Sequence, residues 1–303
     1  MELHTCLWNE VSAFNFRESD LSPILETHPG LTLHFHEDAD AFLRQAESAQ
    51  LVLTWDFPRA WYEHCPSLKL VMTPAAGTDW VEQDPTGQIP VVHGSFHGEI
   101  LAESLLSALL FMNHRMPDMI RNFQTRHWDR NLQKDSLLLQ GQTVLIVGMG
   151  NIGVTCARYI RSMGTTVIGV RRDPGKSPPG TETYAIEALP SLLPEADHVV
   201  LLLPGNHETD GFMTGELLSL CKPGAFIYNF GRGNVLHTRD LVHHWDRFAG
   251  AFLDVTDEEP LPPDSPLWQL DNIMITPHSS CIYDDYRRMF VANVIEELDS
   301  RFK

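Results

Sequence analysis

The sequence predicts an α/β protein made of two doubly wound, parallel-sheet domains. Short apolar runs alternate with helix-like segments up to Gly98, and the alternation resumes at Gln142. Such alternation is typical of parallel sheets with helices packed on their faces. At 303 residues the chain is also too long for one small hydrophobic core, which favours two domains.

In the first series, four apolar runs predict strands, and one helix, Asp38–Glu47, is expected between the first two. A longer apolar helix, Glu99–His114, follows the series and is the expected connection between the domains. The predicted strands are Leu31–Phe35, Leu51–Trp55, Leu68–Met72 and Ile89–Val92.

The second series alternates six predicted strands with four helices, which matches a doubly wound sheet. We expect one domain of residues 1–98 plus 284–303 and another of residues 99–283, with a cleft between them. The strands are Thr143–Val147, Thr166–Val170, Val199–Leu203, Ala225–Asn229, Gly250–Val255 and Ile273–Thr276. The helices are Ile152–Met163, Ile186–Leu193, Thr214–Leu220 and Thr238–Phe248, and an amphipathic segment, Tyr283–Phe302, ends the chain.

Composition excludes several classes of protein. The formal net charge is −18, from 40 acidic and 22 basic residues, which disfavours binding to nucleic acid or to anionic membranes. The sequence shows no secretory leader and no apolar run near the ~20 residues that span a bilayer. Five widely spaced cysteines without a C-x-x-C pair indicate reduced thiols, so we expect a cytoplasmic protein.

A glycine-rich turn follows the first strand of the second series. Residues 148–153 form G-x-G-x-x-G between a strand and a helix, the context of a Rossmann-like dinucleotide site. Gly148 permits a tight turn, Gly150 lets a pyrophosphate approach the backbone, and Gly153 lets helix and strand pack closely. Asn151 and Ile152 begin the helix, whose N–H groups suit phosphate. A purely structural turn is the alternative.

The end of the second strand predicts which cofactor binds. An NAD site usually has Asp or Glu there to bind the ribose 2′-hydroxyl, but this chain has Arg171 and Arg172, with Lys176 nearby. Guanidinium groups bind a 2′-phosphate that a carboxylate would repel. We therefore expect NADPH to be preferred, with NADH possible. The alternative is a solvated basic loop in which Asp173 binds the ribose.

Three further motifs occupy residues 229–233 (N-F-G-R-G), 254–262 (D-V-T-D-E-E-P-L-P) and 266–278, and each extends past the end of a predicted strand. Their order and spacing resemble the D-isomer-specific 2-hydroxyacid dehydrogenase family, as do the segments 76–79 (A-G-T-D) and 102–103 (A-E). The W-x-x-P segment at Trp55, the basic pair and the stretch E-P-L-P-P-x-S-P-L-W resemble its glyoxylate/hydroxypyruvate reductase branch.

The resemblance implies catalytic and cofactor roles for single residues. Arg232 matches the arginine that binds the substrate carboxylate and polarises the adjacent carbonyl, and His278 matches the acid/base residue that protonates the carbonyl oxygen. Glu259 matches the carboxylate that orients His278 and raises its pKa. Asp254 matches the residue that contacts the nicotinamide carboxamide, and Pro204 is also assigned to the cofactor site.

Substrate contacts are expected from the first domain and from the segment after His278. Ala76 and Gly77 match a loop whose amides hold the substrate carboxylate. Trp55 and Tyr283 are expected to line the pocket, although Trp55 equally fits an ordinary aromatic side chain at a strand end. The pairs His34/His36 and His93/His97 have spacings compatible with metal ligation, but neither has a supporting motif, so we expect no metal.

The expected function is NADPH-dependent reduction of small 2-keto acids, such as glyoxylate or hydroxypyruvate, to D-2-hydroxy acids. The resemblance also implies a homodimer formed mainly by the cofactor domains. Two alternatives remain: a phosphoglycerate-type dehydrogenase and a dinucleotide-sensing module of the corepressor type. The first would need a basic patch that the N-terminal half lacks, and an intact Arg232, Glu259 and His278 set disfavours the second.

Overall fold

The computed structural model describes residues 1–132, 136–176 and 181–302, with the side chain of Lys176 outside the described part. The chain forms two compact units: unit 1 consists of residues 1–97 and 282–303, and unit 2 of residues 98–281. These boundaries lie one and two residues before those expected from the sequence. Each unit holds a parallel sheet with helices, so the α/β class with two doubly wound domains is confirmed.

Within the described residues, the sheet of unit 1 has five strands in the order β2-β1-β3-β4-β5. Neighbouring strands pair in parallel, as at Leu3 and Leu51, which face each other across β1 and β3. The strands are β1 (Glu2–Cys6), β2 (Thr32–His36), β3 (Leu51–Thr54), β4 (Leu70–Thr73) and β5 (Val91–His93).

Strand β1 was missing from the sequence prediction, although it lies between β2 and β3. Its residues His4 and Thr5 are polar and fully buried, which hides the apolar signal of an inner strand. His4 is held by Nδ1 to His36 Nε2 at 3.1 Å and by Nε2 to the Ser48 hydroxyl at 3.1 Å.

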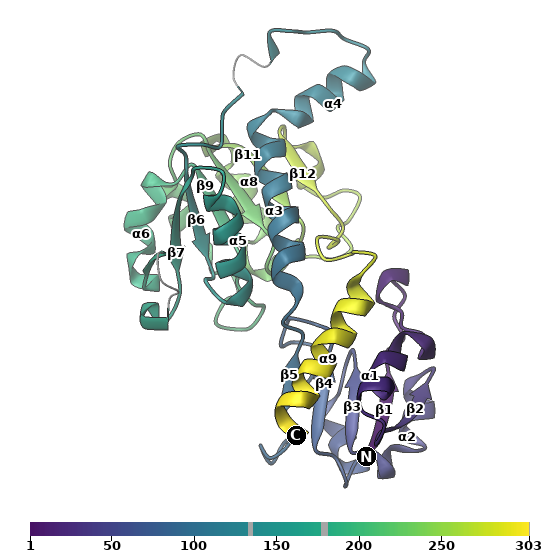
Figure 1. The fold of residues 1–303 in the computed structure, drawn as a ribbon. Coiled ribbons are helices and arrows are strands. Elements are labelled where there is room, and N and C mark those ends of the chain that lie inside the picture. The colour runs from purple at the N-terminus through teal and green to yellow at the C-terminus, as the bar shows by residue number, and fades with distance from the viewer. Residues whose placement is uncertain (133–135, 177–180, 303) are drawn as a thin grey trace. The chain divides into compact units, whose positions relative to one another are not determined.

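The helices of unit 1 are α1 (Ser22–Thr27), α2 (Ala39–Leu43) and α9 (Tyr286–Phe302). Helix α2 begins at the cap residue Asp38, whose side chain accepts from Ala41 N–H at 2.7 Å. Helices α1 and α9 contact each other on the sheet (Figure 1). The C-terminal helix therefore belongs to the first sheet, although it is distant from it in sequence.

Within the described residues, the sheet of unit 2 has seven strands in the order β12-β11-β10-β9-β6-β7-β8. Adjacent strands again pair in parallel. The strands are β6 (Thr143–Val147), β7 (Thr166–Val170), β8 (Glu182–Tyr184), β9 (His198–Leu201), β10 (Ala225–Asn229), β11 (Phe248–Leu253) and β12 (Ile273–Ile275). The prediction of six strands was short by β8, a three-residue edge strand with too few apolar residues to show a pattern.

Helices cover both faces of this sheet because alternate strand residues point to opposite sides. Ile146 and Val200 pack with α3 and α5, whereas Val147 and Leu201 pack with α6, α7 and α8. Figure 1 shows α3 and α5 beside each other on one face of the sheet. The helices are α3 (His97–Asn113), α4 (Met116–Gln124), α5 (Asn151–Arg161), α6 (Leu189–Leu192), α7 (Gly215–Leu220) and α8 (Thr238–His243).

Helix α4 was not predicted, because it follows α3 after only a short break at Arg115, which has a left-handed φ of 55°. Several large apolar side chains on α4 and the segment after it are exposed, notably Phe123 at 85% and Trp128 at 89%. Among the described residues, no helix is both long and apolar enough to cross a membrane.

Candidate active site

The carboxyl ends of the unit 2 strands gather most of the predicted site residues on one edge of the sheet. Gly148 follows β6, Arg171 follows β7, and Pro204 lies shortly after β9. Arg232, Asp254 and His278 follow β10, β11 and β12 in the same way. Ligands of open α/β sheets bind at this edge.

The glycine turn has the shape that the motif predicts. Gly148 has a φ of +117°, and a Cβ there would lie 2.6 Å from the Leu202 carbonyl oxygen. A Cβ on Gly153 would lie 2.3 Å from the Gly148 carbonyl oxygen, so this glycine allows α5 to approach the turn. At Gly150, by contrast, a Cβ would meet no atom within 4 Å. Gly150 therefore borders open space at the N-terminus of α5, where Asn151 and Ile152 form the first turn.

A cavity of about 450 Å³ adjoins this turn, a volume suited to part of a dinucleotide. Its lining includes Gly148, Gly150, Arg171, Arg172, Asp173 and Pro204.

One basic residue of this cavity, Arg172, has a carboxylate partner. Arg172 is 80% exposed and forms an ion pair with Glu208 at 3.3 Å. Asp173 Oδ1 accepts from Gly175 N–H at 3.1 Å and so belongs to the local turn. Glu208 lies 36 residues from Arg172 in the sequence, and nothing in the sequence pattern indicated that it would reach this site.

Glu259 and His278 are in direct contact. His278 Nδ1 lies 2.9 Å from Glu259 Oε2, and since a carboxylate only accepts, Nδ1–H is the donor. The other ring nitrogen, Nε2, is therefore the one that can present a proton to a substrate. Both side chains are partly exposed, at 43% and 39%.

The surroundings of Glu259 favour its ionised form. Burial by itself raises the pKa of Glu259, but the hydrogen bond and the charge of His278 lower it, as do the Thr256 N–H and the charge of Arg232, so the net pKa lies below its ordinary value. The Thr256 N–H donates to Glu259 Oε1 at 3.1 Å. Arg232, Glu259 and His278 thus form one electrostatic group.

The turn that presents Arg232 is shaped by Asn229, the last residue of β10. The buried Asn229 amide accepts from Gly231 N–H at 3.2 Å and donates to the Arg232 carbonyl at 3.0 Å. A Cβ on Gly205 would lie 2.9 Å from Arg232 Cγ, so the loop that contains Pro204 runs from the cavity to Arg232. An Asn at a strand end is a known turn residue, and this was the one signal for its role in the sequence.

Asp254 is 2% exposed and binds the segment that carries His278. Its carboxylate accepts from the Thr276 hydroxyl at 2.6 Å and from Ser279 N–H at 2.9 Å. Ser280 N–H lies 3.2 Å from Oδ1 and 3.1 Å from Oδ2. The sequence predicts only a cofactor contact for Asp254, and no pattern in it indicates these bonds.

Four of the five predicted substrate contacts lie in unit 1, and the fifth, Arg232, lies in unit 2. Ala76 and Gly77 follow β4 and are partly exposed, and Tyr283 is 47% exposed. Trp55 is only 7% exposed, donates its indole N–H to the Phe14 carbonyl at 3.2 Å, and stacks on Tyr286. Trp55 is therefore a core side chain of unit 1 in this structure.

Three of the four histidines in the pairs His34/His36 and His93/His97 contact other side chains. His34 Nε2 lies 2.6 Å from Glu2 Oε2, while His36 contacts His4. His97 Nε2 lies 3.1 Å from the Tyr286 hydroxyl. Within the described residues, no group of three or more His, Cys, Asp or Glu side chains is arranged to hold a metal ion.

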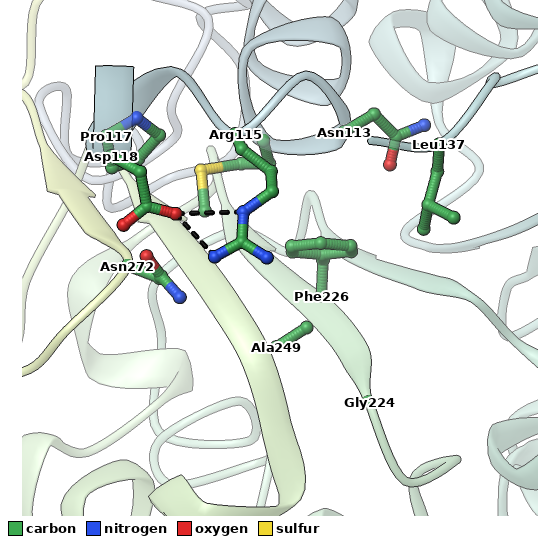
Figure 2. Close-up of a pocket in the computed structure, with 10 residues that line it drawn as sticks. Asn113, Arg115, Pro117, Asp118, Leu137, Gly224, Phe226, Ala249 and Asn272 are labelled. Atoms are coloured by element: carbon green, nitrogen blue, oxygen red, sulfur yellow. Dashed lines mark hydrogen bonds and ion pairs between the residues drawn. The ribbon is translucent and has the colours of Figure 1, made fainter. Parts of the chain in front are cut away.

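A second cavity of unit 2, of about 290 Å³, is lined by residues such as Gly224 and Ala249 near the amino ends of β10 and β11 (Figure 2). Its lining includes none of the predicted site residues. Arg115 binds Asp118 there through Nε at 2.9 Å and Nη2 at 2.6 Å, and Phe226 forms an apolar wall. Since ligands of parallel sheets bind at the carboxyl edge, the first cavity is the candidate for the cofactor.

The chain is similar in sequence to several curated proteins. A curated relative from Corynebacterium melassecola, described as an uncharacterized protein in the proB 3′ region, is 34% identical over 188 residues, and the match spans 61% of each chain. Glyoxylate/hydroxypyruvate reductase B of Enterobacter sp. is 29% identical over 274 residues, 86% of this chain and 83% of that one.

Among solved structures, the NADPH-dependent glyoxylate/hydroxypyruvate reductase of Sinorhizobium meliloti, in complex with NADP and sulfate, superposes with a TM-score of 0.81 at 26% identity. The match covers 99% of this chain and 94% of that one. The family model for the NAD binding domain of D-isomer specific 2-hydroxyacid dehydrogenases matches residues 106–280. That match includes the glycine turn, Arg232, Glu259 and His278, and the chain belongs to the D-isomer specific 2-hydroxyacid dehydrogenase family, a family of oxidoreductases.

Proposed function

We propose that this protein reduces small 2-keto acids, with glyoxylate and hydroxypyruvate as the leading candidates, to D-2-hydroxy acids at the expense of NADPH. The observation that carries the proposal is the Glu259–His278 contact of 2.9 Å on the same sheet edge as the glycine turn. A partly exposed histidine held by a carboxylate is a suitable general acid. The names of the two reductases above support the substrate class.

In this proposal His278 gives its Nε2 proton to the carbonyl oxygen of the keto acid. Glu259 holds Nδ1–H, which fixes the ring orientation and stabilises the protonated ring by its charge. The lowered pKa of Glu259 keeps that charge in place at neutral pH. Arg232 binds the substrate carboxylate, since its planar guanidinium offers paired donors.

The unit 1 residues Ala76 and Gly77 are proposed to add backbone N–H groups to the carboxylate site. The exposed ring of Tyr283 is proposed to border the substrate. For Trp55, its burial among Phe14 and Tyr286 favours a packing role, in which it supports the substrate-binding unit without contact to the substrate.

The residues around the glycine turn fit a nicotinamide dinucleotide. The open space at Gly150 is a cradle that any Cβ would partly fill, and the first turn of α5 directs N–H groups toward it. Pro204 would border the dinucleotide, and Asp254 would accept from the nicotinamide carboxamide. When bound, the reduced dinucleotide supplies the hydride for the reduction.

The preference for NADPH rests on Arg171 and Arg172, which line the same cavity and suit a 2′-phosphate. Lys176 is a proposed third contact. Asp173, the alternative ribose ligand, already accepts from Gly175 N–H, which favours the arginines as the deciding residues.

We also propose a homodimer. On α4 and the segment that follows it, Phe123, Trp128 and Leu138 are 85%, 89% and 74% exposed. Apolar side chains this exposed indicate a surface that another protein covers, and a second copy of this chain would cover it symmetrically. Sedimentation should show a dimer, and Phe123→Asp with Trp128→Asp should shift it to monomer. A cytoplasmic location stays a prediction from the spacing of the cysteines.

The test of the activity is the loss of absorbance at 340 nm with NADPH and a panel of 2-keto acids. We expect turnover of glyoxylate or hydroxypyruvate, a higher kcat/KM with NADPH than with NADH, and no turnover by His278→Ala. Binding of NADPH by His278→Ala should persist, because Gly150 and Arg171 are unchanged. If no keto acid is reduced although NADPH binds, the proposal is wrong, and a dinucleotide sensor is the better interpretation.

A further inference from the structure

The turn of residues 276–280, which carries His278, has a constrained backbone. His278 has a φ of +49°, a left-handed conformation that side chains other than glycine adopt when the surrounding structure fixes it. The His278 N–H lies 2.8 Å from the Asp254 carbonyl and 3.0 Å from the Thr276 carbonyl. The main chain at His278 is thus tied to Asp254, the residue after β11, as well as to its own turn.

The Asp254 carboxylate spans this turn from one side of His278 to the other. Before the histidine, the Thr276 hydroxyl donates to Oδ1 at 2.6 Å. After it, Ser279 N–H donates to Oδ1 at 2.9 Å and Ser280 N–H lies within 3.2 Å of both oxygens. A carboxylate with several donors is a strong acceptor, so a 2%-exposed Asp254 holds both arms of the turn at once.

Helix α3 holds the far arm from another direction. The Ser104 hydroxyl donates to the Ser280 carbonyl at 2.8 Å. Glu259 then holds the imidazole of His278 itself. The ring and the backbone that carries it are therefore fixed by separate groups, and the Thr276 hydroxyl donates to the Asp254 carboxylate from a side chain, whereas Ser279 and Ser280 donate from the backbone.

We infer that Thr276 is a positioning residue for the proton donor His278, and that it acts through the Asp254 carboxylate; this inference rests on the proposed function. Without the Thr276 hydroxyl, the Asp254 carboxylate can rotate, which releases the arm of the turn at Ser279 and Ser280. His278 then samples positions from which proton transfer is slower. Displacements of about 1 Å in an active site can lower rates by about a hundredfold.

Thr276 is a sharper test than Asp254, because Asp254 has a proposed contact with the cofactor as well. Thr276→Val removes the hydroxyl and keeps the shape, and Thr276→Ser keeps the hydroxyl. Thr165→Val is the matched control, since its hydroxyl donates to the Ile160 carbonyl at 2.9 Å, on the loop between α5 and β7.

Two measurements separate positioning from folding. Steady-state kinetics with NADPH and glyoxylate should show kcat about tenfold lower in Thr276→Val, with the KM for glyoxylate unchanged within about twofold. Hydrogen exchange of the cofactor-free protein, followed on a peptide that covers residues 276–281, should be faster in the same variant. Thr276→Ser and Thr165→Val should match the wild type in both measurements.

Unchanged exchange in Thr276→Val would overturn the inference, and so would faster exchange with unchanged kcat. Equal loss of kcat in Thr276→Ser would also overturn it, since the hydroxyl would then not be the cause. If Thr276→Val does not fold, Thr276→Ala removes the same hydroxyl and should give the same loss of kcat and the same faster exchange. Absence of turnover in the wild type overturns the proposed function instead, and the exchange measurement still decides whether Thr276 holds the turn.

Discussion

Replacement of Gly150 by alanine should weaken cofactor binding without harm to the fold. The backbone at Gly150, with φ −82° and ψ −165°, lies in the extended region that any residue adopts. The added Cβ would meet no protein atom within 4 Å. Glycine-to-alanine changes at such positions stabilise by about 0.4–1 kcal/mol, while alanine is a poorer N-cap by about the same amount. The expected change in the free energy of unfolding is therefore within about 0.5 kcal/mol.

The same Cβ would project where a pyrophosphate has to approach. Amide-to-phosphate hydrogen bonds need about 2.9 Å between heavy atoms, and a methyl group in that space would prevent at least one of them. A lost hydrogen bond to a charged group amounts to about 1.5–3 kcal/mol, so the Kd for NADPH should rise by about tenfold to a hundredfold. Quenching of protein fluorescence by NADPH measures the Kd, and thermal unfolding measures stability.

Gly153→Ala is the matched control with the opposite expectation. Its Cβ would lie 2.3 Å from the Gly148 carbonyl oxygen, so α5 has to move and the Tm should fall. If Gly150→Ala binds NADPH as the wild type does while the Tm is also unchanged, the dinucleotide does not approach this turn and the assignment of the cofactor site is wrong.

Three further predictions concern single side chains. Arg171→Ala should lower kcat/KM for NADPH by about tenfold and leave kcat/KM for NADH unchanged. Glu208→Gln releases Arg172 from its 3.3 Å ion pair and should lower the KM for NADPH by up to about fivefold. Equal effects of these variants on both cofactors would contradict the role of the arginines. Glu259→Gln should lower kcat by about a hundredfold with NADPH binding intact, as steady-state kinetics and fluorescence titration will show; unchanged kcat would remove Glu259 from the mechanism. Burial lowers the pKa of His198 to about 4, whereas the unfolded chain takes up this proton near pH 6.5, so this residue makes stability fall as pH falls from 6.5 to 4. His198 should account for about 2 kcal/mol of the stability lost between pH 7 and pH 5, and urea unfolding of His198→Asn should show a loss smaller by that amount.

The strands that the sequence predicted well are those buried on both faces. Residues 144–147 of β6 and 199–201 of β9 are continuous apolar runs because helices cover both sides of the sheet at those positions. Strand β1 is equally buried, yet its His4 is polar and is satisfied by His36 and Ser48, from segments 32 and 44 residues away. Such long-range satisfaction of a buried side chain leaves no periodic signal in the sequence.

In the candidate site, too, the sequence predicted some features and left others without a signal. The positions of Arg232, Asp254 and His278 followed from the rule that functional residues lie at the carboxyl ends of parallel strands. The bonds between these loops did not follow, because they depend on loop conformations that no periodicity encodes. The ion pair of Arg172 with Glu208 and the bond of Thr276 to Asp254 are examples.

The net charge of −18 does not decide what binds at this edge. Surface charges are screened over about 8 Å at physiological ionic strength, so groups within the site dominate. There, Arg172 is compensated by Glu208, and the charge of Arg232 acts on Glu259. The amides at the start of α5 have no side chain at Gly150 to cover them and present their partial charge to any phosphate. We therefore expect affinity for the pyrophosphate, which both cofactors share, to depend on backbone amides. The choice between the cofactors is proposed to depend on Arg171 and on Arg172, whose charge Glu208 moderates.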